Sequence, residues 1–313
     1  MSPRNVKRLI YALPGNEDFA DLLALRGNWE RRPLMVHRFP DGESLVTVAE
    51  PEPDAEALLV CTLNHPDPKL LPLLMAADTL HELGAVRVIL VAPYLAYMRQ
   101  DVRFHPGEAV SSRILAGLLD AHFDTVITIE PHLHRHASLA EAGLRHGFVA
   151  SAAPAIAAWI SNHVRDPVII GPDEESRQWA TQIAHLIRVP VAIASKQRND
   201  DAHVTVRLPN EVGALCKHRT PVLVDDIISS GHTMTECTHQ LARLGLHPPL
   251  CVAVHGLLGA TARERILAAG AVRIVTTNSI DCPYARIDIS GSLAEAIDAI
   301  DHRPHPAAHS SAA

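Results

Sequence analysis

The chain has 313 residues, of which 47% are hydrophobic and 20% are charged, an ordinary composition for a folded globular protein. At roughly 150 residues per domain this length indicates about two domains, and the composition excludes a disordered, collagenous or disulfide-framework chain. The 28 Lys and Arg residues stand against 35 Asp and Glu residues, so the formal net charge is −7. No uniformly basic face can be assembled for duplex nucleic acid, and we expect no nucleic-acid partner. Local groups must therefore hold any anionic ligand.

Cysteine usage and hydropathy bear on the cellular compartment. The five cysteines are odd in number and form no C-x-x-C pair, which favours reduced thiols. The basic N-terminus leads into an apolar stretch that stops at Pro14, Gly15 and Asn16 without a cleavage-like site, so we expect no signal peptide. The uncharged stretch from 146 to 164 is rich in Ala and is predicted to form a loop followed by a buried helix, not a membrane span. We expect a cytoplasmic protein with no membrane partner.

In chain order, short runs rich in Val and Ile alternate with longer Ala/Leu patterns of helical period. In the first half the predicted strands are Arg8–Leu13, Ala57–Leu63 and Arg87–Pro93, and the predicted helices are Ala20–Arg26, Leu70–Leu83 and Ser111–Leu119. In the second half the predicted strands are Pro167–Ile170, Val191–Ala194, Pro221–Ile227, Leu250–Val254 and Val272–Thr276, and the predicted helices are Gln178–Leu186, Thr233–Leu244 and Ala260–Ala269. This alternation predicts α/β domains with largely parallel sheets and helices on both faces.

Gly143, Gly147 and Pro154 interrupt the hydrophobic pattern near the middle of the chain, so we place the domain boundary between 145 and 155. We therefore predict an N-terminal domain over 1–147 and a C-terminal domain over 148–301. The tail 302–313 carries two prolines and no apolar periodicity, so we expect it to be disordered.

The segment from Pro221 to Leu244 carries the clearest chemical pattern. A predicted strand ends in Asp225 and Asp226, and the carboxyl ends of such strands are where α/β sheets bind ligands. Small residues and hydroxyls follow and lead into a helix, which suits a phosphate held by backbone N–H groups; they are Ser229, Ser230, Gly231, His232 and Thr233. Ser and Thr cap helices routinely, but the adjacent carboxylates favour a phosphate site next to a sugar. Neither a Walker A loop nor a Rossmann glycine pattern occurs.

The run VLVDDIISSGHT resembles the phosphoribosyl-pyrophosphate binding motif of type I phosphoribosyltransferase folds. Further segments narrow the resemblance to the ribose-phosphate diphosphokinases, the phosphoribosyl-pyrophosphate synthetases, in which they occur in the same order. They are RFPDGE at 38–43, PYLAYMRQD at 93–101, TIEPH at 128–132, GPD at 171–173 and Lys196-x-Arg198. The resemblance spans about residues 7 to 300. It implies two tandem type I phosphoribosyltransferase-like domains, with ATP on the N-terminal side and ribose 5-phosphate on the C-terminal side.

The resemblance also implies an activity. The C1 hydroxyl of ribose 5-phosphate attacks the β-phosphorus of ATP, which yields phosphoribosyl pyrophosphate for nucleotide biosynthesis and leaves AMP. Such a transferase needs Mg²⁺, and it forms a homo-oligomer, a dimer or a hexamer, because the ATP site is shared between subunits. Two other readings are a non-catalytic regulatory homologue of the synthetase and a base-using phosphoribosyltransferase. The second leaves the DGE turn, the RQD segment and a whole domain unexplained.

Residue roles follow from the resemblance position by position. Lys196 and Arg198 become the catalytic cations, a chemically reasonable pair because Lys offers a point charge and Arg a bidentate fork. The ATP-binding residues are Asp41, Gly42, Glu43, Arg99, Gln100 and His132, the first three reaching ATP from a neighbouring subunit. The metal contacts are His132 and Asp173. Asp225, Asp226 and the loop from Ser229 to Thr233 take ribose 5-phosphate.

The sequence departs from the family pattern at three places. His232 stands where the phosphate loop has glycine, and Glu174, Glu175 and Ser176 stand where glycines are usual. The segment 133–136 replaces an acidic regulatory segment, so the resemblance does not imply allosteric control by ADP. His132, His134 and His136 share one face of an extended strand, which leaves a zinc or nickel site, or solvent-facing histidines, as alternatives to magnesium.

Overall fold

A computed structural model of the chain describes residues 6–133, 135–200 and 203–300, with the side chains of 196–205 outside that description. The first half forms a six-stranded sheet in the order β2-β1-β5-β6-β7-β8, and every neighbouring pair is parallel. Its strands are β1 (Arg8–Ala12), β2 (Glu30–Arg32), β5 (Glu56–Val60), β6 (Arg87–Ala92), β7 (Thr125–Ile129) and β8 (Gly147–Ala150). Its helices are α1 (Glu17–Gly27), α2 (Asp67–Glu82) and α3 (Ser111–His122).

The second half repeats this arrangement in a parallel sheet of order β10-β9-β13-β14-β15-β16. Its strands are β9 (Pro167–Gly171), β10 (Val191–Ile193), β13 (Thr220–Ile228), β14 (Leu250–Gly256), β15 (Arg273–Thr277) and β16 (Ala285–Ile287). The remaining helices are α4 (Ala153–His163), the short 3₁₀ turn Glu174–Ser176, α5 (Arg177–Ile187), α6 (Val212–Cys216), α7 (His232–Arg243), α8 (Ala260–Ala268) and α9 (Ser290–Ile300). The predicted class, two tandem α/β domains with mainly parallel sheets, is confirmed.

Each half also carries one antiparallel hairpin at the same point of its topology, after the edge strand and before the central strand. The first consists of β3 (Leu34–Arg38) and β4 (Ser44–Val48), and the second of β11 (Ser195–Asp200) and β12 (His203–Arg207). The predicted elements did not include these hairpins.

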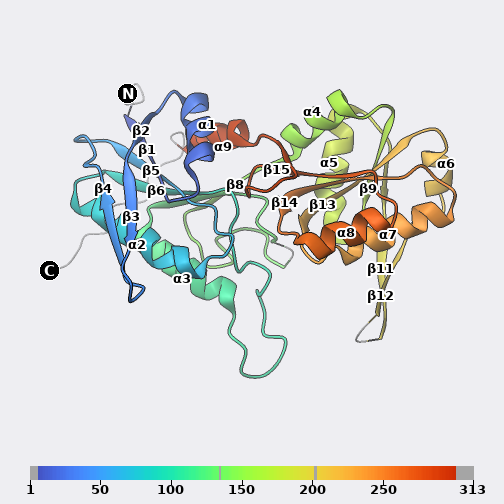
Figure 1. Cartoon of the computed structure of the whole chain (residues 1–313), viewed down its shortest axis with the longest axis horizontal. Coiled ribbons are helices and arrows are strands. Elements are labelled where there is room, and N and C mark those ends of the chain that lie inside the picture. The colour runs from blue at the N-terminus through green and yellow to red at the C-terminus, as the bar shows by residue number, and fades with distance from the viewer. Residues whose placement is uncertain (1–5, 134, 201–202, 301–313) are drawn as a thin grey trace.

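The core explains how the two halves hold together. One cluster of buried apolar side chains runs through both sheets and the helices α1, α9, α4 and α5, of which α1, α9 and α4 lie along the top of Figure 1. The other face of each sheet has its own cluster, under α2 and α3 in the first half and under α7 and α8 in the second. Burying one Leu or Ile side chain contributes about 1.5–3 kcal/mol, so the shared cluster couples the two halves strongly.

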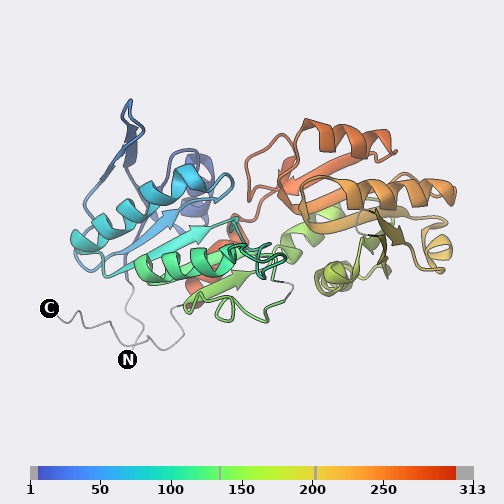
Figure 2. The same cartoon turned by 90° about the horizontal axis from the view of Figure 1, so that it is seen from below.

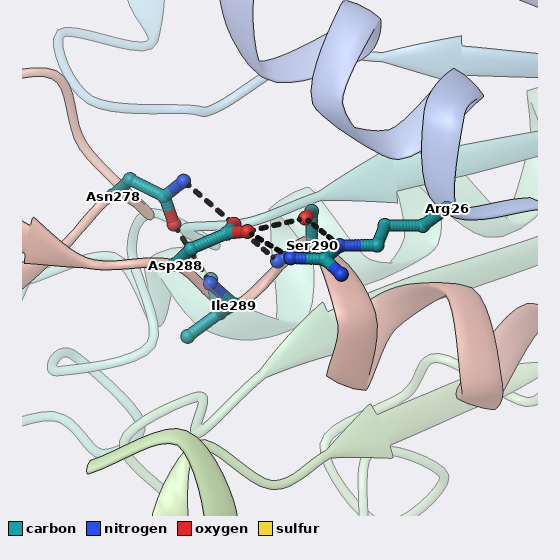
Figure 3. A network of polar contacts seen from close by, with 5 residues as sticks. All are labelled: Arg26, Asn278, Asp288, Ile289 and Ser290. Carbon is teal, nitrogen blue, oxygen red and sulfur yellow. Dashed lines mark hydrogen bonds and ion pairs between the residues drawn. The ribbon is translucent and has the colours of Figure 1, made fainter. Parts of the chain in front are cut away.

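Helix α9 ends the described chain and returns to the first half, where it lies beside α1 (Figure 1). A polar network fastens this return: the Asp288 carboxylate accepts from Arg26 of α1, from Asn278 and from the backbone and hydroxyl of Ser290 (Figure 3). Figure 2 shows the same arrangement from below. The predicted boundary after residue 147 stays a prediction. Strand β8 begins at Gly147 and pairs with β7 of the first sheet.

Two local expectations were wrong. The segment before α4 was expected to be a loop, but 147–150 forms the edge strand β8. Strand β13 ends at Ile228, one residue beyond the predicted Pro221–Ile227, so the paired aspartates lie within the strand and not at its end; residues 225, 227 and 228 pair with β14. The carboxylates therefore belong to a rigid strand.

Candidate active site

The paired aspartates lie near the carboxyl end of β13, in the middle of the second sheet. Asp226 is buried, whereas Asp225 is half-buried and its Oδ1 accepts a hydrogen bond from the Asp226 backbone N–H at 3.0 Å. The strands on either side hold β13 in place, so the position of both carboxylates is fixed by the sheet.

The predicted phosphate loop turns sharply at Gly231 and leads into α7. Gly231 has φ +75°, and a Cβ there would meet Ile266 Cδ1 at 3.0 Å and the Ala262 carbonyl at 3.3 Å, so any other residue is strained at this position. The His232 side chain is exposed and points to α8, where its Nε2 lies 3.1 Å from Arg265 Nη1. Arg265 also donates to the Ser230 carbonyl at 2.8 Å. The departure at His232 therefore leaves the tight approach of the loop intact.

Two polar contacts join this loop and strand to the first half of the chain. His132, which follows β7, has its Nδ1 2.6 Å from Asp226 Oδ2. Arg99, in the loop between β6 and α3, donates from Nη1 to Ser229 Oγ at 3.3 Å. Residues predicted for ATP thus meet residues predicted for ribose 5-phosphate.

The loop that carries Arg99 is held on both sides. Gln100 accepts from the Ser111 hydroxyl at 2.8 Å, at the start of α3. The buried Asp101 pairs with Arg135 at 2.6 Å, which ties this loop to the segment after His132. In that segment His134 lies outside the described residues.

Asp173 follows β9, the neighbour of β13, and is buried. Its Oδ1 accepts from the Ser176 backbone N–H at 3.1 Å and caps the 3₁₀ turn. Within the described part of the chain, no three His, Cys, Asp or Glu side chains group as a metal site.

Lys196 and Arg198 lie on β11, opposite Val206 and Val204 of β12. Their side chains lie outside the described residues, so their predicted roles stay predictions. The base of the hairpin is anchored by Gln240 of α7, which accepts from the Leu208 backbone N–H at 3.2 Å and donates to the Val206 carbonyl.

Asp41, Gly42 and Glu43 form the turn of the β3–β4 hairpin. All three are exposed, Gly42 has φ +95°, and Asp41 Oδ1 accepts from the Glu43 backbone N–H at 3.1 Å. The hairpin extends from the first sheet on the side away from β13 (Figures 1 and 2). The fold thus does not bring this turn to the His132–Asp226 contact of the same chain.

The prediction from sequence missed three residues next to that contact. His255 on β14 is fully buried, Tyr94 stacks edge-on to it with ring centroids 5.0 Å apart, and Glu130 precedes His132 by two residues. Burial lowers the pKa of His255 to about 4 and raises that of Glu130. The available signal was a polar residue at the end of an apolar strand run, LCVAVH for His255 and TVITIE for Glu130.

A cleft of about 740 Å³ opens beside these residues, between the two sheets. The first half lines it with 63–68, Tyr94 and Tyr97, and the second half with 256–259 and 280–282. Tyr94 also borders the small pocket around Arg99, His132 and His255, so the two spaces adjoin.

The comparisons with known proteins agree with this geometry. Residues 9–122 match the N-terminal domain of ribose phosphate pyrophosphokinase, and residues 149–285 match the phosphoribosyl transferase domain. Two proteins named ribose-phosphate pyrophosphokinase are similar along most of their length. The one from Methanopyrus kandleri is 35% identical over 86% of this chain and 91% of its own, and the one from Saccharolobus solfataricus is 34% identical over 82% and 88%.

The crystal structure of phosphoribosylpyrophosphate synthetase from Mycobacterium smegmatis shares the fold. Its TM-score is 0.78 at 23% identity, with 94% of this chain and 98% of that chain covered. Among the residues that the structure describes, no helix is both long and apolar enough to cross a membrane. The matched domains and the identity over most of the sequence show that this chain belongs to the ribose-phosphate pyrophosphokinase family.

Proposed function

We propose that the chain transfers the diphosphoryl group of ATP to the C1 hydroxyl of ribose 5-phosphate, giving phosphoribosyl pyrophosphate and AMP for nucleotide biosynthesis. The observation that carries this proposal is the 2.6 Å contact between His132 and Asp226. It joins the two halves of the chain at the point where the two substrates have to meet.

In this reaction the sugar phosphate occupies the second half. The loop from Ser229 to Thr233 receives the 5-phosphate with backbone N–H groups at the start of α7, while Asp225 and Asp226 accept hydrogen bonds from ribose hydroxyls. ATP enters from the first half, where Arg99, Gln100 and His132 contact its base and phosphates. Phosphoryl transfer depends on in-line positioning and charge neutralisation more than on covalent help.

Lys196 and Arg198 then neutralise charge that develops on the transferring diphosphoryl group. The β11–β12 hairpin that carries them follows β10 at the edge of the second sheet, and Gln240 anchors its base beside α7. The same α7 begins at the phosphate loop, so the hairpin and the loop share one support.

The magnesium ion is part of this proposal. When bound, Mg²⁺ neutralises the phosphate oxygens of ATP and orients them for attack. His132 and Asp173 are the side chains we assign to it; a carboxylate suits this oxygen-seeking ion, and an imidazole acts partly through water.

A homo-oligomer in the cytoplasm completes the proposal. The turn 41–43 lies away from the His132–Asp226 contact, which fits a turn that serves the ATP site of a second subunit. Met35 and Leu45 are 62% and 52% exposed on the outer face of the same hairpin, where a subunit contact would cover them.

The test is product analysis with purified protein, ATP, Mg²⁺ and ribose 5-phosphate. We expect AMP and phosphoribosyl pyrophosphate in equal amounts with no added base. Release of ADP would mean attack at the γ-phosphorus and would contradict the proposal. No AMP at all would favour a regulatory homologue or a base-using transferase, and nucleotide formation from added phosphoribosyl pyrophosphate and a nucleobase would identify the latter.

A further inference from the structure

His255 connects the two halves of the molecule through both of its ring nitrogens. Its Nδ1 lies 2.9 Å from Ser279 Oγ in its own half, and its Nε2 lies 3.2 Å from the carbonyl oxygens of Ile129 and Glu130 in the other half. Because carbonyl oxygens only accept, Nε2 must carry the proton. The Ser279 hydroxyl lies at Nδ1 and has the Val254 carbonyl as a second partner at 3.1 Å. The ring is 1% exposed, so neither nitrogen can exchange its partner for water.

Glu130, one of the two residues that His255 contacts, has an unfavourable backbone conformation. Its φ of +40° is in the region that residues other than glycine rarely adopt, and such strain persists only where surrounding contacts hold it. Its carboxylate accepts from Ser151 Oγ at 2.8 Å and from the Ala152 N–H at 3.1 Å. Its carbonyl accepts from the His132 N–H at 3.1 Å as well as from His255.

The strained turn sets the position of His132. Since the same Glu130 carbonyl receives His255 and closes the turn to His132, a shift of this carbonyl moves the imidazole that contacts Asp226. His255 lies on β14 directly beside Ile227, the residue after Asp226 on β13. The buried His255 ring therefore fixes the position of the Glu130 turn relative to β13, the strand that carries the aspartates.

We propose that His255, together with Glu130, is an interdomain positioning clamp that holds His132 against Asp226 in the geometry that diphosphoryl transfer requires. The proposal rests on the function proposed above. The hydrogen bonds of His255 to the first half are made to the carbonyls of Ile129 and Glu130, so we expect it to act through the Glu130 turn.

The experiment compares two amides that each replace one half of the ring. His255→Gln places its amide near Nε2 and keeps a donor for the two carbonyls, whereas His255→Asn places it near Nδ1 and cannot reach them. We expect H255N to lower kcat on the order of 10-fold or more with KM values for both substrates little changed, because misplacement of a positioned group costs rate. We expect H255Q to recover most of this loss.

A matched core variant separates positioning from stability. Val252 is buried on the same strand and carries no polar side-chain group, so V252A is expected to lower Tm by a cavity effect and leave kcat unchanged below its melting range. H255N with normal kcat, or H255Q as impaired as H255N, would overturn the proposal.

Amide hydrogen exchange over residues 129–133 gives a readout that needs no activity. We expect faster exchange there in H255N than in H255Q or the wild type. If H255N does not fold, Ser151→Ala loosens the same turn from the Glu130 carboxylate, and unchanged exchange in S151A would overturn the clamp. Wild-type protein that makes no AMP would overturn the proposed function alone, because the exchange comparison would still test the clamp.

Discussion

The Asp226 carboxylate is buried and needs a partner, and it is also expected to bind sugar hydroxyls. A buried carboxylate costs free energy unless it is paired, and the imidazole of His132 provides that pairing at 2.6 Å. The same carboxylate lies near the carboxyl end of a central strand, where sugar hydroxyls are expected. Asp225 is half-buried and has a different environment, so two adjacent and chemically identical residues are not interchangeable.

The first prediction compares the effects of Lys196 and Arg198 substitutions on kcat and on KM. If these cations meet charge that develops in the transition state, K196A or R198A should lower kcat on the order of 10²-fold, about 3 kcal/mol, and raise KM much less. Steady-state kinetics with both substrates measures the split, and the exposed Lys217→Ala is the matched control. Near-normal turnover with only weakened ATP affinity would remove these residues from catalysis.

The second prediction concerns the phosphate loop, where substitution of residue 231 should weaken substrate binding and substitution of residue 232 should have little effect. Gly231→Ala imposes a left-handed conformation on alanine, about 1–2 kcal/mol, and pushes the loop off Ile266. Losing one hydrogen bond to a charged phosphate then raises KM for ribose 5-phosphate on the order of 10-fold. His232→Gly should stay near wild type, because that side chain points to Arg265. Equal damage from both variants would show that His232 contributes to the loop.

At the scale of elements, the sequence allowed the α/β alternation to be predicted because parallel strands buried on both faces read as continuous apolar runs. Strands such as RVILVA and helices such as SSRILAGLLDAH carry their period in their own residues. The hairpins β3–β4 and β11–β12 were missed because they project from the sheets and mix polar with apolar residues. Strand β16 has only three residues, too few to show a period.

In the candidate site, too, features built from consecutive residues could be predicted and features built from distant residues could not. The loop 229–233 could be singled out as a phosphate-loop candidate because its residues are consecutive, and its role stays a prediction. His255 could not, because its contacts with residues 129 and 130 join positions more than 120 residues apart in the sequence. Its function depends on the packing of two sheets, and no local pattern contains that information.

The third prediction concerns the docking of α9 through Asp288. Burial alone would raise the pKa of this carboxyl, but hydrogen bonds from Ser290, Arg26 and Asn278 lower it below its ordinary value of 3.8. Since the folded-state pKa is the lower one, the stabilisation is present above pH 3.8 and is lost as the pH falls through the folded-state pKa. At neutral pH, D288N should lower the free energy of unfolding by about 1–3 kcal/mol.

Urea unfolding at several pH values measures this effect. The difference between wild type and D288N should shrink toward zero as the pH falls below 3.8, and the exposed Asp281→Asn nearby should show little difference at any pH. A constant difference between wild type and D288N across pH would mean that the amide disturbs packing instead of charge.

At the scale of the whole molecule, the two halves are variations on one topology. Each places a hairpin between its edge strand and its central strand, and each central strand runs into a loop and a helix, β5 into α2 and β13 into α7. Only β13 carries paired carboxylates at this end, since Cys61 and Thr62 follow β5. One half therefore carries the proposed sugar-phosphate loop, and the other presents Arg99 and His132 across the interface.

The two hairpins lie differently with respect to the candidate site of their own chain, which bears on how subunits assemble. The hairpin of the second half carries the predicted catalytic cations of its own site, while that of the first half extends away from β13 with its turn at 41–43. If the turn completes the ATP site of a second subunit, each site needs one hairpin from each of two chains.

The last prediction tests that requirement by mixing two inactive variants. Glu43→Ala removes a carboxylate from the turn, and Lys196→Ala removes a cation from the other hairpin, so each homo-oligomer should be nearly inactive. In a mixed dimer, one of the two sites combines the intact turn of one chain with the intact cation of the other. Random exchange of subunits makes about half of the dimers mixed, so activity should return to about a quarter of wild type. No recovery after verified subunit exchange would place the turn in the site of its own chain and would require the hairpin to move toward β13.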